Sequence, residues 1–100
     1  MIWTPAPYRW PEGRTAAASF SVDVDALSPW LWQHRGGMPG LLAAREHRQY
    51  GMRRGLARMV AMLDRLGVRG TFFVPGVVAE ENPDLLPGLL ERGHEIGLHG

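Results

Sequence analysis

The sequence contains no cysteine and no lysine, and its charges nearly balance. The missing cysteine excludes a disulfide framework and a thiolate metal site, so any metal would have to be bound by His, Asp or Glu. All eleven basic residues are arginines, which we take as a compositional bias of the genome. The formal net charge of +1 gives no electrostatic reason to expect a nucleic-acid partner.

Long apolar runs are also missing. The opening stretch, MIWTPAPYRWPEGR, lacks the apolar core of a secretory signal, and no segment approaches the length of a membrane span. We therefore expect a cytoplasmic protein without a membrane partner. With 45% hydrophobic and 21% charged residues, the 100-residue chain has the composition of one small globular domain. Residues 1–15 show no periodicity and are predicted to form an irregular arm, whose Trp3, Tyr8 and Trp10 could pack on the body.

Two segments have clear β-strand patterns. In Ala16–Ala26, apolar residues alternate with polar ones, which places Asp23 and Asp25 side by side at the end of one face. Val68–Gly76 is apolar enough to be a mostly buried strand, and its Pro-Gly pair ends it. The sequence therefore predicts two strands separated by about forty residues, a distance that leaves room for a crossover helix.

Two helices are predicted from periodicity and end signals. Met52–Leu66 carries one apolar stripe and ends at Gly67. A second helix should begin with Asn82 as its cap and Pro83 at its first position. Pro87 lies inside this helix and should cause a kink or a loose first turn. The predicted stripe of the first helix consists of Met52, Leu56, Met59, Val60, Leu63 and Leu66.

The last eight residues, GHEIGLHG, raise the question of a metal motif. A zinc-protease helix needs two histidines four residues apart, whereas His94 and His99 are five apart and would lie on nearly opposite sides of a helix. Gly93 is a suitable helix stop, and a strand running to His99 fits the remaining residues better. On that strand His94 and His99 should not share a ligand cluster, and His99 is the better metal candidate.

The order strand, helix, strand, helix, strand predicts a parallel sheet with right-handed crossovers. The carboxyl ends of parallel strands form one edge, where such folds carry their sites. Asp23, Asp25 and His99 would meet there, and carboxylate with imidazole around a divalent metal is a hydrolytic arrangement. Taken singly, paired aspartates at a strand end also cap turns, and a lone histidine is more often hydrogen-bonded in a core or edge.

Leu27–Gly40 is predicted to be a long loop, with helical turns possible after it. Trp30 and Trp32 could line a pocket or could pack the loop onto the body. The remaining candidates, interpreted as loop residues on the surface, are His34, Glu46 and His47.

Three stretches, SFSVDVDA, GTFFVPG and GHEIGLHG, occur in the order and at the separations typical of the polysaccharide deacetylase family, also called the NodB-homology domain or carbohydrate esterase family 4. The resemblance covers about residues 16–100. The segment YGMRRGLARMVAMLDRLGVRGTFFVPG further resembles the branch with peptidoglycan-deacetylase-like and allantoinase-like proteins, which carries Asp-x-Asp where many members have adjacent aspartates.

The resemblance implies an α/β fold with parallel strands, in which this chain supplies the first three β-strands and two helices of a deformed (β/α) barrel. It implies a divalent metal, typically zinc, with Asp25 and His99 as ligands and Asp23 as the catalytic base. The reaction would be hydrolysis of a carbon–nitrogen amide bond in an N-acetylated amino sugar or a small cyclic amide or imide. The family's second metal histidine stands four positions after His99, beyond the last residue of this sequence.

We therefore expect residues 16–100 to be the N-terminal part of a deacetylase-like domain, truncated inside its metal motif. A second hypothesis is an inactive fragment or interaction module of the same fold. A three-stranded piece leaves a sheet edge and apolar faces uncovered, so on this hypothesis we expect a homo-oligomer. A small doubly wound sheet of receiver or flavodoxin type ranks last, since no phosphate- or flavin-binding loop is visible.

Overall fold

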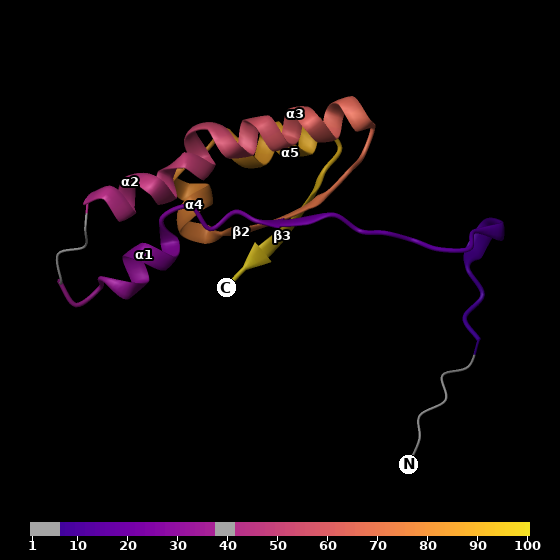
Figure 1. Ribbon diagram of the computed structural model, residues 1–100, viewed down its shortest axis with the longest axis horizontal. Coiled ribbons are helices and arrows are strands. Elements are labelled where there is room, and N and C mark those ends of the chain that lie inside the picture. Colours follow the sequence, from indigo (N-terminus) through magenta and orange to yellow (C-terminus); the bar gives the residue numbers. More distant parts are fainter. Residues whose placement is uncertain (1–6, 38–41) are drawn as a thin grey trace, which may run out of the picture.

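The computed structural model describes residues 7–37 and 42–100 and contains a three-stranded parallel sheet. The strands are β1 (Ser21–Asp23), β2 (Thr71–Pro75) and β3 (Glu95–His99), in the order β1-β2-β3 (Figure 1). Asp23 lies opposite Phe73, and His99 lies opposite Pro75. The predicted parallel topology is thus confirmed, and the carboxyl ends of the three strands form one edge.

The first strand is shorter than the predicted Ala16–Ala26. Only Ser21–Asp23 pairs fully with β2, although the Thr71 N–H donates to Phe20 O (2.9 Å) and the Val24 N–H to Phe73 O (2.8 Å). Residues 14–20 are exposed, and among them Phe20 alone bonds to β2, which begins at Thr71. The alternating pattern is real, but pairing length is set by the neighbouring strand and not by the pattern.

A continuous helical segment crosses from β1 to β2. It comprises α2 (Leu42–Tyr50), a π-helical turn η2 (Gly51–Gly55) and α3 (Leu56–Leu66), and the backbone stays right-handed at the junctions. The prediction of a helix beginning at Met52 was therefore too short by at least ten residues. Its predicted end is confirmed, because Gly67 has φ +63° and its N–H donates to carbonyls of the last turn.

Two further helices lie in segments that were not predicted as helical. Helix α1 (Ser28–Gln33) occupies the segment interpreted as a loop, and α4 (Gly76–Glu81) follows β2 directly. Asn82 does not cap the next helix, α5 (Leu85–Glu91). Its side-chain amide donates instead to Val78 O (2.8 Å) at the end of α4.

Pro87 does not break α5, so of the predicted kink or loose first turn the kink is absent, while the helix begins only at Leu85, after a turn at residues 83–84. Pro87 is the third residue of that helix, where the missing N–H would have no intrahelical acceptor. The stop at Gly93 is confirmed, because this residue has φ +79° and its N–H donates to Leu90 O (2.9 Å). The chain then enters β3 at the predicted point.

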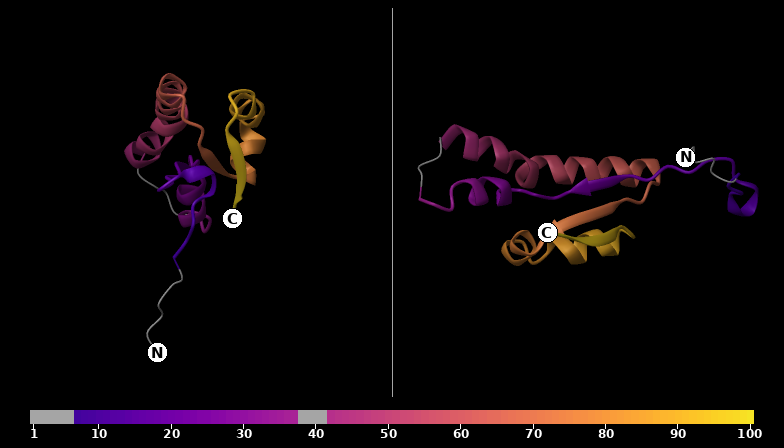
Figure 2. Two further views of the ribbon diagram at one scale, coloured as in Figure 1. Left: turned by 90° about the vertical axis from the view of Figure 1, so that its right-hand side faces the viewer. Right: turned by 90° about the horizontal axis from the view of Figure 1, so that it is seen from below.

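The core lies between the sheet and two helices. Helices α3 and α5 run side by side over the same face of the sheet, as both views in Figure 2 and the view in Figure 1 show. The buried residues that form this core are Val24, Val60, Leu63, Phe72, Val74, Val78 and Leu89. Burial of their apolar side chains supplies the main driving force for packing the helices on the sheet.

The N-terminal arm extends away from this body (Figure 1). Its described part has one 3-10 turn at Pro11–Gly13, and Tyr8 and Trp10 make an edge-to-face contact with each other at 4.9 Å. Tyr8 and Trp10 thus do not pack on the body, and Trp3 lies outside the described residues. Among the helices of the described segments, none has the length and apolar character needed to cross a bilayer.

Candidate active site

The two aspartates flank the end of β1. Asp23 is the last residue of the strand and Asp25 lies two positions on, while Val24 between them in sequence is buried in the core. The chain then turns sharply, since Ala26 has φ +50° and the Ser28 N–H donates to Asp25 O (2.9 Å). This turn leaves both carboxylates at the carboxyl edge of the sheet, where their side chains remain 63% and 41% exposed.

His99 reaches the same point from β3. Its Nε2 lies 3.5 Å from Asp25 Oδ1 and 3.7 Å from Asp23 Oδ2. His99 is 74 and 76 positions after the two aspartates in the chain, and it meets them only because the strands are parallel and in this register. The structure therefore brings together all three residues that the sequence placed at this edge.

The electrostatics at His99 favour a positive charge. Its Nδ1 lies 3.1 Å from Gly100 O and would donate to that carbonyl, which leaves Nε2 directed at the two carboxylates. The hydrogen bond to the Gly100 carbonyl, followed by the negative charges of Asp25 and Asp23, raises the pKa of His99, while desolvation opposes the rise. A neutral Nε2 would point its lone pair at carboxylate oxygens, so either a proton or a cation relieves this arrangement.

The donor atoms fit part of a divalent metal site. Two ligands bonded tetrahedrally to zinc at roughly 2.0–2.1 Å lie roughly 3.3 Å from each other, close to the 3.5 Å between Nε2 and Asp25 Oδ1. A hydrogen bond from the other ring nitrogen to a carbonyl is the usual orientation device for a metal-binding histidine. Within residues 7–37 and 42–100, however, no group of three or more such side chains has the arrangement of a complete cation site.

His94 is separate from this cluster, as predicted. It is 4% exposed, its Nδ1 accepts from the Gly70 N–H (3.1 Å), and its ring meets Phe72 edge-on at 5.0 Å. It stands immediately before β3 and therefore at the amino end of the sheet, opposite His99. Its role is to join the start of β3 to the turn before β2.

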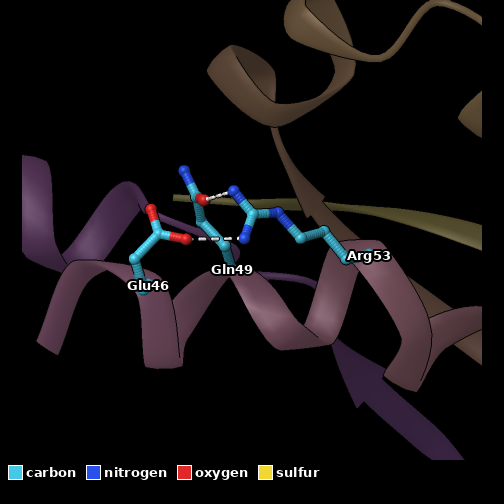
Figure 3. Close-up of polar contacts among 3 residues, drawn as sticks. All are labelled: Glu46, Gln49 and Arg53. Carbon is cyan, nitrogen blue, oxygen red and sulfur yellow. Dashed lines mark hydrogen bonds and ion pairs between the residues drawn. The ribbon is translucent and has the colours of Figure 1, made fainter. Parts of the chain in front are cut away.

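The weaker candidates face solvent or pack locally. His34 follows α1 and lies 2.8 Å from Trp30 O through Nδ1. Glu46 and His47 are on α2, so their interpretation as loop residues was wrong. Figure 3 shows that Glu46 and Gln49 both accept hydrogen bonds from the Arg53 guanidinium. Arg53 Nη1 lies 2.6 Å from Glu46 Oε2, and the Arg53 and Glu46 side chains are exposed. The Gln49–Arg53 pair, four residues apart, stabilises a helix by only about 0.2–0.5 kcal/mol.

An open pocket of about 760 Å³ adjoins the site and includes Asp25 and His99 in its lining. Trp32 lines it, whereas Trp30 stacks on His34 at 4.4 Å and is half-buried. Of the two possibilities left open, lining a pocket therefore applies to Trp32 and local packing applies to Trp30. Leu31 and Val77 also line the pocket, and no sequence signal distinguished them from core residues.

Comparison with known proteins agrees with this geometry. The family model for polysaccharide deacetylase matches residues 49–100. A crystal structure from Mycobacterium smegmatis, provisionally classed as a polysaccharide deacetylase, superposes with a TM-score of 0.78 at 40% identity, covering 97% of this chain and 34% of that one. Similarity at this level supports the deacetylase fold over the doubly wound alternative.

Two curated relatives extend the comparison. A peptidoglycan deacetylase-like protein of Gibberella zeae is 34% identical over 89 residues, which are 80% of this chain and 24% of the relative. The peptidoglycan deacetylase of Helicobacter pylori is 26% identical over 88 residues, 82% of this chain and 27% of the relative. The chain thus spans about a quarter of the length of these relatives. On the family match and the shared fold, the chain belongs to the polysaccharide deacetylase family.

Proposed function

We propose that these residues form the first part of the active site of a divalent-metal-dependent hydrolase that cleaves carbon–nitrogen amide bonds other than peptide bonds. One observation carries the proposal: Asp23, Asp25 and His99 converge at the carboxyl edge of the sheet, with His99 Nε2 within 3.7 Å of both carboxylates. Membership of a deacetylase family supports the hydrolytic reaction class.

The three side chains would have different roles, set by their positions. Asp25 and His99, whose donor atoms are 3.5 Å apart, would hold the metal. When bound, a divalent metal polarises the scissile carbonyl and acidifies a water molecule. Asp23 is the more exposed carboxylate and would accept the proton of that water as general base. A mixed nitrogen and carboxylate donor set favours zinc over magnesium, which prefers oxygen alone.

The substrate class follows from the relatives. Two of them are named as peptidoglycan deacetylases or as similar to one, which favours an N-acetylated amino sugar over a small cyclic amide or imide. A tetrahedral site with one position open for water needs a third protein ligand. The family resemblance puts this ligand four positions after His99.

The test is amide hydrolysis by the polypeptide that carries these residues. Acetate release from N-acetylated amino-sugar oligomers would be measured with zinc and after chelation. We expect activity to require metal, to fall at least about 100-fold in Asp23→Asn because general-base catalysis typically contributes 10²–10⁴, and to be lost in Asp25→Ala. The control is Asp64→Ala on α3, whose carboxylate pairs with Arg92 away from the site. Full activity in Asp25→Ala would refute the proposed metal site.

A second candidate, an interaction module without catalysis, has one observation in its favour. In the described sheet β3 is an edge strand, and its Leu98 is 84% exposed although the neighbouring Val74 is buried. An exposed edge with a large apolar side chain is a surface for self-association or for a further strand. Sedimentation of the polypeptide tests this candidate: a concentration-dependent oligomer without bound metal supports it, and a well-folded monomer counts against it.

A further inference from the structure

The pocket beside the site has a wall that the proposed chemistry does not use. Asp25 and His99 contribute its polar end. Helix α1 contributes Leu31 and Trp32 on one side, and the start of α4 contributes Val77 on the other. The volume of about 760 Å³ is within the 300–1,000 Å³ range of small-molecule sites.

These apolar side chains are unusually exposed for their size. Trp32 is 67% exposed, Leu31 42% and Val77 40%. Helix α1 does not need Trp32 for its packing, because Trp30 on the same helix is half-buried and stacked on His34. Scattered exposed apolar residues need no explanation, but three of them lining one pocket next to reactive groups are typical of a ligand-binding surface.

Arg35 holds the Trp32 ring in place. Its guanidinium carbon lies 3.9 Å from the centroid of the indole ring, and its Nη1 donates to Trp32 O at 2.7 Å. The cation–π contact occupies one face of the indole and restricts its rotation before any ligand arrives. Such preorganisation reduces the entropy lost on binding. With Arg35 on one face, the Trp32 side chain is still 67% exposed.

We propose that Trp32 is a specificity-determining residue, whose free indole face packs against the C–H face of a saturated ring of the substrate while the reacting amide lies at Asp25 and His99. The negative face of an indole attracts the weakly positive C–H groups of such a ring. A small cyclic imide bound only at the polar end would make no use of this contact. The inference rests on the proposed function and assigns the residue that recognises the non-reacting part of the substrate.

The kinetic test compares Trp32→Ala, Trp32→Phe and the control Trp10→Ala, which removes an exposed tryptophan of the arm. With an N-acetylated amino-sugar oligomer, we expect KM to rise about tenfold in Trp32→Ala with kcat within about twofold, because the contact is made equally in ground and transition states. Trp32→Phe should recover most of the loss, and Trp10→Ala should behave as wild type. An unchanged KM in Trp32→Ala, or an equal rise in Trp10→Ala, overturns the inference.

A binding measurement separates this inference from the proposed function. In the Asp23→Asn protein, the indole N–H signal of Trp32, assigned by its absence in Trp32→Phe, would be followed by NMR during titration with diacetylchitobiose. A saturable shift supports the inference even if no amide is hydrolysed, provided that the apparent affinity is about threefold weaker in Arg35→Gln. Hydrolysis without any response of the Trp32 signal overturns the inference and leaves the proposed function standing.

Discussion

At the scale of single residues, the site depends on how His99 is held. Its pKa is raised from the ordinary 6.5 by the bond to the Gly100 carbonyl and then by Asp25 and Asp23. We expect an NMR titration of the metal-free polypeptide to show this rise, and Asp25→Asn to lower the His99 pKa toward 6.5. An unchanged pKa in Asp25→Asn would show that the carboxylate does not act on the ring.

The direction of the His99 pKa shift determines how stability depends on pH. A pKa raised by folding means that the folded state binds the His99 proton more tightly, so the associated stabilisation is present below pH 6.5 and is lost as pH rises through the higher folded value. The contribution is small, because the His99 side chain is 33% exposed and its two carboxylate partners are more exposed still, so solvent screens the charges. The same proton competes with metal for Nε2, so metal affinity should fall as pH drops below the folded pKa.

At the scale of elements, the sequence predicted the parts that local pattern determines. The parallel pairing of the strands, the helix stops at Gly67 and Gly93, and the meeting of Asp23 with His99 were predicted from periodicity and end signals. Helix α1 was missed because Pro29 and two tryptophans in six residues give no apolar stripe. Leu66 belongs to the predicted stripe but is 66% exposed, since periodicity cannot tell where the sheet beneath a helix ends.

The contact between β2 and β3 gives a prediction at this scale. A Cβ added at Gly97 would lie 2.5 Å from Phe73 Cδ1, whereas one added at Gly88 in α5 would meet nothing within 4 Å. Gly97→Ala should therefore force the Phe73 ring or the strand to shift and destabilise the fold by about 1–3 kcal/mol. Gly88→Ala is the matched control and should be neutral or stabilising by up to about 1 kcal/mol, because alanine favours a helix.

Urea unfolding of the two variants checks this pair. Equal midpoints for Gly97→Ala and Gly88→Ala would mean that β3 does not approach β2 as closely as the structure shows. Because Gly97 is two residues before His99, Gly97→Ala should also displace His99 from the carboxylates. The His99 titration would then move toward its ordinary value along with the loss of stability.

At the scale of the whole molecule, the chain is three adjacent strands and their covering helices, about a quarter to a third of the length of its relatives. The sequence patterns could predict that Asp23, Asp25 and His99 meet at the carboxyl ends of the strands, because Asp23 and His99 end strands with a clear register and Asp25 follows directly after the first. They could not predict the pocket wall, because Leu31 and Val77 come from helices whose positions depend on tertiary contacts.

The most direct test of the account is zinc binding by the polypeptide that carries these residues, measured by calorimetry at neutral pH. We predict one zinc per chain, with affinity reduced at least about 100-fold in Asp25→Ala, more than the 10–100-fold typical of partners that only orient a ligand. Asp64→Ala should bind as wild type. Zinc bound equally well by Asp25→Ala would contradict the claim that the edge formed by β1 and β3 is a metal centre.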